Sequence, residues 1–169
     1  MDILNVVRDR FTAKSFDREP VDDAVLDRIL EVGRLAPSAK NRQAWRFIAI
    51  RRMETKEALA EACYGDPRVA DAGCVIAACT TNIQYTMPNG QASYPLDLAF
   101  AVSYMGLQAQ SEGLGTAVLA TYDEDSVKDL LTVPYAMRVV LLLAVGRTSD
   151  TAPIKNRLPK DRVISYDHW

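Results

Sequence analysis

Three polar segments of the 169-residue sequence carry the residue types that bind a phosphorylated ligand. Arg10-Phe11-Thr12-Ala13-Lys14 places two cations and a hydroxyl directly after a short helical segment. The stretch 37–45 is a polar loop between a helix stop and an aromatic-led strand, and 155–159 holds a cation pair near the C-terminus. Each segment alone is typical of a surface turn, an ordinary connection or a charged terminus. Together they offer the Arg and Lys donors that phosphate groups require.

The side chains of the common catalytic mechanisms are scarce. The single histidine, His168, lies beside the C-terminus, so a Ser-His-Asp or Cys-His arrangement would have to use that terminal residue. Cys63, Cys74 and Cys79 form no C-x-x-C pair, and we expect buried thiols rather than a disulfide framework or a metal cluster. We therefore assign no catalytic side chain and no metal ligand, and expect a bound cofactor to carry the chemistry.

The composition restricts the class of protein. With 49% apolar and 25% charged residues, a chain of this length can build the core of one domain. A net charge of -2 offers no broad cationic surface for nucleic acid. The longest apolar stretches, 73–79 and 139–145, are far shorter than the ~20 residues that cross a bilayer. Residues 1–5 lack the pattern of an export signal, so we expect a cytoplasmic protein without nucleic-acid or membrane partners.

Apolar periodicity and capping residues predict alternating helices and strands. Asp2 is a candidate cap for a short helix through Arg8, and Asp22 or Asp23 for a second helix that Pro37 stops. Strands are expected at 45–51, 74–80, 116–120 and 139–145, and further helices at 54–62, 96–112 and 124–131. The segment 81–94 has the composition of a surface excursion, and 147–169 that of a polar, irregular tail.

The expected helix 96–112 is apolar on most sides, which predicts that it is buried. Phe100 and Tyr104 lie at helical spacing within it, and this favours core positions over a role in a pocket. A helix of this kind is unusual in a single-sheet monomer of 169 residues. We therefore expect a second subunit to cover one of its faces.

Four motifs in chain order resemble those of the FMN-dependent nitroreductase family, over nearly the whole chain. The family's R-x-S/T-x-R/K turn is matched at 10–14, and its A-P-S-x-x-N-x-Q-P-W loop at 36–45, where Ala44 replaces the usual proline. The family's G-L-G-T/S motif is present at 113–116 and its K-x-R-L-P motif at 155–159. Each motif is weak alone, but the four in order form a fairly specific signal.

The resemblance implies an α+β fold in which helices flank a central, mostly antiparallel sheet. It also implies a homodimer formed through the long buried helix, with FMN at the interface. Residues 1–150 would form the FMN-binding domain, and 151–169 an extension that reaches across the partner. Within that extension, 163–166 is a candidate edge strand for the partner's sheet.

The resemblance also implies a role for each motif residue. Arg10 of the first motif and Lys155 and Arg157 of the last, with the Thr12 hydroxyl, would hold the FMN phosphate, which carries roughly two negative charges. Lys14 would stabilise the negative charge that reduction places on the N1/O2 edge of the flavin. Arg68 matches a basic position that some family members use for the same edge. The loop 37–41 would come from the other subunit, and the backbone of 118–121 would face the N5 and O4 side of the flavin. The implied FMN-binding residues are Arg10, Phe11, Thr12, Lys14, Pro37, Ser38, Ala39, Asn41, Arg68, Val118, Leu119, Ala120, Thr121, Lys155 and Arg157.

The activity that the resemblance implies is the transfer of electrons from NADH or NADPH, through flavin N5, to an electron-poor acceptor. Nitroaromatic compounds and quinones are the expected small-molecule acceptors, and use of one flavin face by both substrates in turn predicts ping-pong kinetics. Such chemistry needs no side-chain acid or base, which agrees with their scarcity here.

Three alternatives remain at this point. The chain could be a non-catalytic FMN-binding or sensing module with the same cationic pocket. It could be an enzyme of the same fold with different chemistry, such as reductive dehalogenation or dehydrogenation. It could also be an interaction protein that holds no cofactor.

Overall fold

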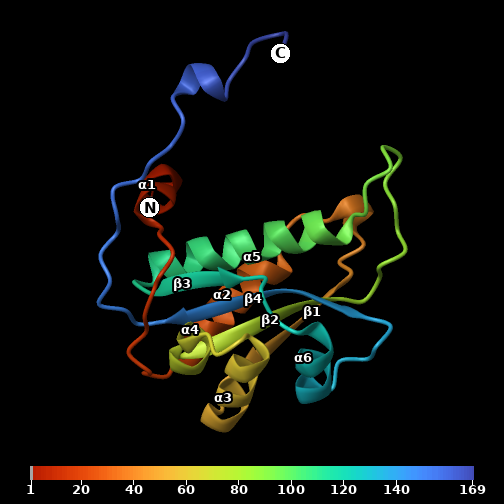
Figure 1. Cartoon of the computed structure of the whole chain (residues 1–169). Coiled ribbons are helices and arrows are strands. Elements are labelled where there is room, and N and C mark those ends of the chain that lie inside the picture. The colour runs from red at the N-terminus through yellow and green to blue at the C-terminus, as the bar shows by residue number, and fades with distance from the viewer. Residues whose placement is uncertain (1) are drawn as a thin grey trace.

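The computed structural model describes residues 2–169, and its centre is a four-stranded sheet. The strands are β1 (Trp45–Ile50), β2 (Cys74–Thr80), β3 (Gly115–Leu119) and β4 (Arg138–Gly146). They lie in the order β1-β2-β4-β3, and every neighbouring pair is antiparallel. Helices cover both faces of the sheet (Figure 1). The expected α+β fold with an antiparallel sheet is therefore confirmed.

The helices begin and end within about two residues of their expected bounds. They are α1 (Ile3–Asp9), α2 (Asp23–Arg34), α3 (Met53–Ala62), α4 (Pro67–Asp71), α5 (Tyr94–Ser111) and α6 (Glu124–Leu131). Side chains of the expected caps Asp2 and Asp22 accept backbone N–H groups at the start of α1 and α2. The sequence analysis missed α4 and two short 3-10 turns, at Ala39–Asn41 and Lys160–Arg162.

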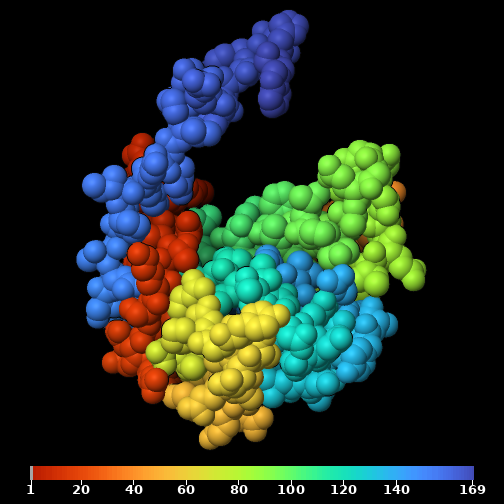
Figure 2. Space-filling model, viewed as in Figure 1, coloured from red at the N-terminus to blue at the C-terminus, as the bar shows by residue number. Residues whose placement is uncertain are grey.

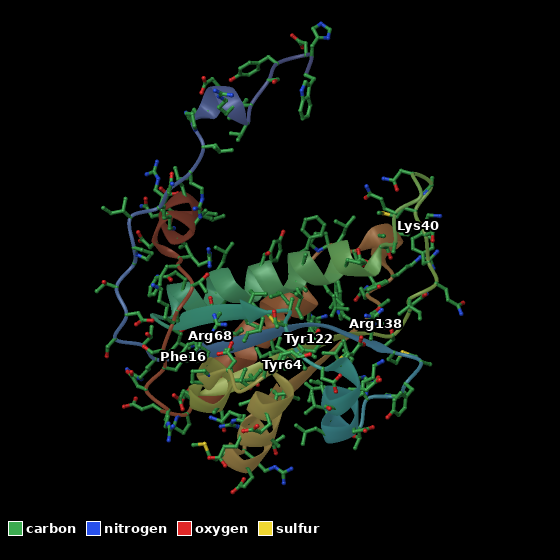
Figure 3. All side chains as sticks on the ribbon, viewed as in Figure 1. Phe16, Lys40, Tyr64, Arg68, Tyr122 and Arg138 are labelled. Atoms are coloured by element: carbon green, nitrogen blue, oxygen red, sulfur yellow. The ribbon has the colours of Figure 1, made fainter. Side chains whose placement is uncertain are left out.

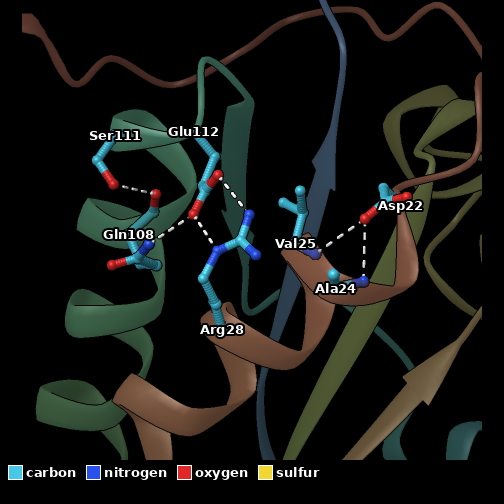
Figure 4. A network of polar contacts seen from close by, with 7 residues as sticks. All are labelled: Asp22, Ala24, Val25, Arg28, Gln108, Ser111 and Glu112. Carbon is cyan, nitrogen blue, oxygen red and sulfur yellow. Dashed lines mark hydrogen bonds and ion pairs between the residues drawn. The ribbon is translucent and has the colours of Figure 1, made fainter.

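Two apolar clusters form the core, one on each face of the sheet. In β2, Val75, Ala77 and Cys79 belong to the cluster beneath α3, α4 and α6, whereas Cys74 and Ile76 belong to the cluster beneath α2 and α5. This alternation is the two-residue period of a strand with both faces covered. At the end of α5, a polar network joins α5 to α2 (Figure 4).

The long helix α5 has one buried face and one exposed face. Leu98, Val102 and Met105 are almost fully buried against the sheet and α2. Phe100 and Tyr104, however, are 49% and 43% exposed, so the expectation that they belong to the core is wrong for the single chain. The cause is their position four residues apart on the outer face, where no element within residues 2–169 buries them.

The C-terminal tail runs past α1 and then away from the rest of the molecule (Figure 1). Figure 2 shows it as an arm, with the surface hollowed over α5 between this arm and the 81–94 excursion. Residues 163–166 form no strand in the single chain, and pairing with a partner's sheet stays a prediction. Within residues 2–169, no helix combines the length and hydropathy needed to cross a membrane.

Candidate functional site

The first motif, 10–14, lies along the edge of β3. Thr12 forms a parallel bridge with Thr116, and the N–H of Ala13 donates to the carbonyl oxygen of Thr116 over 2.9 Å. These backbone contacts bring the N-terminal segment to the end of the G-L-G-T motif. The side chains of Thr12 and Lys14 remain exposed, so both can reach a ligand.

Asp150 holds this segment from the other end of the chain. Its Oδ2 accepts the backbone N–H groups of Lys14 and Ser15 over 2.6 and 3.1 Å, and its Oδ1 accepts the Ser15 hydroxyl. These donors lower the pKa of the Asp150 carboxyl below its usual value. Asp150 thus orients the backbone that carries Lys14. Nothing in its sequence context marked it in advance, since its partners are more than 130 residues away.

Gly115 is required by packing at the start of β3. A Cβ on this residue would lie 2.5 Å from Cγ2 of Thr148 and 3.1 Å from Cβ of Ala13. The glycine therefore lets the motif strand, the N-terminal segment and the chain after β4 lie in close contact. The preceding motif glycine, Gly113, has a positive φ of 77° and follows the end of α5.

The cations of the last motif return to the N-terminal helix. Nζ of Lys155 donates to the carbonyl oxygens of Val7 and Arg8, in the last turn of α1. Arg10 directly follows this turn, so the segments that carry Arg10 and Lys155 lie side by side. Arg157 is exposed two residues farther along the tail, and its guanidinium donates to the carbonyl oxygen of Asn156.

Arg68 lies on the short helix α4, where Asp66 fixes its side chain. The guanidinium donates to the Asp66 carboxylate through Nε at 3.0 Å and Nη2 at 2.5 Å, and this pairing lowers the pKa of Asp66. The Asp66 side chain also accepts the backbone N–H of Arg68. The arrangement holds Arg68 half-buried near the side of the molecule that carries α4, away from Lys40 (Figure 3).

The loop of the second motif has a strained backbone. Lys40, Asn41 and Gln43 have φ values of 53°, 53° and 50°, in the left-handed region that non-glycine residues seldom adopt. The Ser38 hydroxyl accepts the N–H of Gln43 over 3.0 Å and closes the loop. Conformations of this kind persist where surrounding contacts fix them, and they concentrate at functional sites.

Contacts with neighbouring segments fix that loop. The N–H of Ala39 donates to Oδ1 of Asp97, in the first turn of α5, over 2.8 Å. The guanidinium carbon of Arg42 lies 3.9 Å from the centre of the Tyr85 ring, and Nζ of Lys40 lies 5.7 Å from it. The excursion 81–94, whose role the sequence left open, therefore supports the loop.

One chain keeps the second motif apart from the other motifs. The loop contacts the first turn of α5, whereas the first and third motifs meet beyond its last turn. An 18-residue helix is about 27 Å long. Figure 3 shows Lys40 beside the N-terminal end of α5, far from Arg68. A single copy therefore does not place the loop against the region around Arg10 and Lys155, called the cation region below.

The segment 118–121 presents both side chains and backbone. Val118, Ala120 and Thr121 are exposed, whereas the Leu119 side chain is in the core. Ala120 borders a pocket of about 310 Å³ that Tyr122 and the ion-paired Arg138 also line. Figure 3 shows these last two side chains. A ligand at the end of β3 would thus meet backbone groups and an aromatic, polar pocket.

The three thiols are buried, as expected. Burial raises the pKa of Cys63, Cys74 and Cys79 to about 11 in each case, so they are protonated near neutral pH. Their position in the core and their protonation leave them unsuited to nucleophilic chemistry.

Comparison with curated proteins finds similarity over nearly the full chain. The chain is 25% identical over 197 residues to the NADH dehydrogenase of Thermus thermophilus, covering 98% of this chain and 96% of that protein. It is 25% identical over 179 residues to the FMN reductase (NAD(P)H) of Bacillus subtilis, covering 96% of this chain and 72% of that protein.

Solved structures share the fold. A nitroreductase family protein from Clostridium difficile 630 has a TM-score of 0.89 at 24% identity, with full coverage of both chains. One from Clostridium novyi NT has a TM-score of 0.82 at 28% identity, covering 87% of this chain and 86% of that one. A family model described as "Nitroreductase family" matches residues 7–92 and 64–147. Since these matches span most of the sequence and contain the first three motifs, the chain belongs to the nitroreductase family of oxidoreductases.

Proposed function

We propose that this protein is a homodimeric, FMN-dependent oxidoreductase that takes electrons from NADH or NADPH. Its acceptors are nitroaromatic compounds, quinones or similar electron-poor molecules, reduced with ping-pong kinetics. The family assignment and the names of the relatives, among them an NADH dehydrogenase and an FMN reductase, support an NAD(P)H-dependent oxidoreductase. The observation that carries the proposal is the separation of the loop from the cation region by the length of α5.

A two-fold dimer resolves that separation. If two copies pack with their α5 helices antiparallel, the loop of each copy comes to lie against the cation region of the other. The outer face of α5 presents Leu96, Phe100 and Tyr104, each 42% to 49% exposed, as an apolar row for this packing. Ile3 of α1 and Tyr104 also line a groove of about 480 Å³ that a partner could fill. In such a dimer, the extended tail 151–169 reaches across the partner.

The residues present fit an FMN phosphate. Arg10 and Lys155 lie at the end of α1, Arg157 follows in the tail, and none of the ion pairs found within residues 2–169 involves them. Lys155 and Arg157 donate only to backbone carbonyl oxygens, so no carboxylate neutralises their positive charge, which stays available to an external anion. The Thr12 hydroxyl is exposed beside them and adds a further donor. The donor set therefore suits a dianionic phosphate better than a neutral ligand.

The protein's part in the reaction is to bind, orient and stabilise charge. FMN supplies the ability to accept a hydride and pass electrons onward. Arg10, Lys155 and Arg157 would hold the phosphate, and Lys14 would stabilise negative charge at the N1/O2 edge. The Asp150 contacts fix the backbone of Lys14 for that purpose. Backbone groups of 118–121 would face the N5 side.

The phosphate assignment is tested by comparing two ligands. Replacing Arg157 by Ala should weaken FMN binding about tenfold or more, because the lost donor is charged, while leaving riboflavin binding nearly unchanged. Fluorescence titration of the apoprotein measures both dissociation constants. Arg162→Ala, an exposed tail residue outside the motif, is the matched control. Equal losses for FMN and riboflavin would place Arg157 away from the phosphate.

Rapid mixing separates an enzyme from a binding module. Under anaerobic conditions, NADH or NADPH should bleach the flavin absorbance at a rate of order 1 per second or faster. A flavin that stays oxidised would favour the sensing module. Parallel reciprocal plots against NAD(P)H at several acceptor concentrations are expected from ping-pong kinetics, and intersecting lines would contradict them.

A further inference from the structure

The side chain of Asp97 is a buried carboxylate that accepts one hydrogen bond within residues 2–169. It is 5% exposed, and its Oδ1 accepts the N–H of Ala39 over 2.8 Å. Its Oδ2 is buried and has no hydrogen-bond donor within residues 2–169. A buried oxygen without a donor costs free energy, and more so when it is charged. A contribution to stability alone therefore does not explain Asp97, and its one hydrogen bond, from the N–H of Ala39, suggests another role.

That contact lies at the start of the strained turn. Ala39 immediately precedes Lys40 and Asn41, whose left-handed backbones cost of order 1 kcal/mol or more each. On the far side of the turn, the Ser38 hydroxyl accepts the N–H of Gln43. Asp97 thus anchors one side of the turn to α5, and the local hydrogen bond closes the other side.

The neighbouring cations do not replace this anchor. Arg42 and Lys40 lie over the Tyr85 ring, at 3.9 and 5.7 Å from its centre, and Tyr85 belongs to the 81–94 excursion. Both are exposed, so their contacts are accessible to water and salt. The buried bond from Ala39 to Asp97 is therefore the firmer link between the loop and a helix.

We propose that Asp97 is a positioning residue, which holds the turn 38–43 in its strained shape so that it can contact FMN across the dimer interface. The proposal rests on the proposed function for its last step, because the loop meets FMN only in the dimer. The role of Asp97 is to accept one N–H, so an uncharged acceptor of the same shape should serve as well.

Limited trypsin digestion of the FMN-free protein tests the anchor without the cofactor. Trypsin cuts after Lys40 and Arg42, so loss of the anchor should expose both bonds. We expect Asp97→Ala to be cut there about tenfold faster than the unmodified protein, and Asp97→Asn to be cut at the unmodified rate. Equal cleavage of Asp97→Ala and the unmodified protein, or of the two variants, would overturn the proposal.

Two further variants support that test, one as a second way to remove the hydrogen bond and one as a control. Ala39→Pro removes the N–H from the opposite side of the bond at the first position of a turn, where proline is tolerated, and it should speed cleavage as Asp97→Ala does. It serves if Asp97→Ala does not fold. Asp123→Ala removes a comparable acceptor of a backbone N–H, at the start of α6. It should lower the melting temperature and leave cleavage after Lys40 and Arg42 unchanged.

Binding of FMN tests the second step. Asp97→Ala should weaken FMN about tenfold, and Asp97→Asn should restore the affinity of the unmodified protein. Fast cleavage together with unchanged FMN affinity in Asp97→Ala would refute the role in cofactor contact while leaving the anchor intact. Failure of the unmodified protein to bind FMN would refute the proposed function, and the digestion would still report on the anchor.

Discussion

The strand β2 and the helix α1 are both rich in apolar residues, yet they have opposite environments. Every residue of Cys74–Thr80 is buried, whereas none of Ile3–Asp9 is. β2 pairs with β1 on one side and β4 on the other, so the chain itself completes its surroundings. In α1, Ile3 and Val7 are 75% and 46% exposed. The chain thus covers β2 by itself, whereas it leaves much of the apolar surface of α1 exposed.

The largest effect is expected beside β2, the fully buried member of this comparison. A Cβ on Gly73, directly before β2, would lie 2.3 Å from the carbonyl oxygen of Glu19, a backbone atom that cannot turn aside. Gly73→Ala should therefore destabilise the fold by about 3 kcal/mol through overpacking. Urea unfolding measures the change. Gly106→Ala is the matched control, because its Cβ would have its nearest contact at 3.9 Å, and it should be neutral or stabilising.

A substitution on the exposed outer face of α5 should change the assembly of the protein rather than its folding. Phe100→Glu puts a charge in the exposed row of α5, and we expect the dimer dissociation constant to rise about 100-fold, or ~2.7 kcal/mol. FMN affinity should fall with it, since both copies build each site. Sedimentation velocity across a dilution series measures the first effect. Met53→Glu, on α3 at the other face, should leave assembly unchanged. A Phe100→Glu protein that stays dimeric would remove α5 from the interface.

The smallest effect is expected at the ion pair that joins α5 to α2, outside both regions. Glu112, at the end of α5, accepts Nε and Nη2 of Arg28 on α2, at 2.7 and 2.9 Å, and the amide of Gln108 (Figure 4). These donors, the Arg28 side chain first, lower the pKa of Glu112 to about 2. Arg28 is half-exposed, so solvent screening keeps the gain in stability near neutral pH small.

The direction of the pH dependence follows from that depressed pKa. The contribution is fully present above the unfolded pKa of about 4.5 and is lost as the pH falls towards about 2. The free energy of unfolding of the unmodified protein should thus exceed that of Glu112→Gln at pH 6, and the difference should vanish near pH 2. A difference that is constant across this range would show that the carboxylate charge is not what matters.

Much of the fold could be predicted from local signals. Strand and helix bounds followed from apolar periodicity and caps such as Asp22, because those signals act within a few residues. The helix α4 was missed because it has only five residues, although Asp66 as a cap and Pro67 at the first position form a recognisable start. The strained turn at Lys40 could not be predicted, because none of its residues with a positive φ is a glycine.

The candidate site divides in the same way. The motifs located the cations and the loop, because charge and residue type are properties of the sequence. Asp150 and Asp97 escaped notice, since each acts on a backbone N–H far away in the chain, 136 and 58 residues distant. The separation of the loop from the cations along α5 was likewise invisible. It became evident only once both were placed in space.

By itself, the sequence determined the identities of most elements, the supply of cations and the family. Tertiary structure alone decided which apolar faces the chain covers and which it leaves exposed. It also decided which carboxylates hold the backbone of the site. The physical reason is that periodicity and capping are local, whereas burial and hydrogen bonding between distant segments depend on how the whole chain packs.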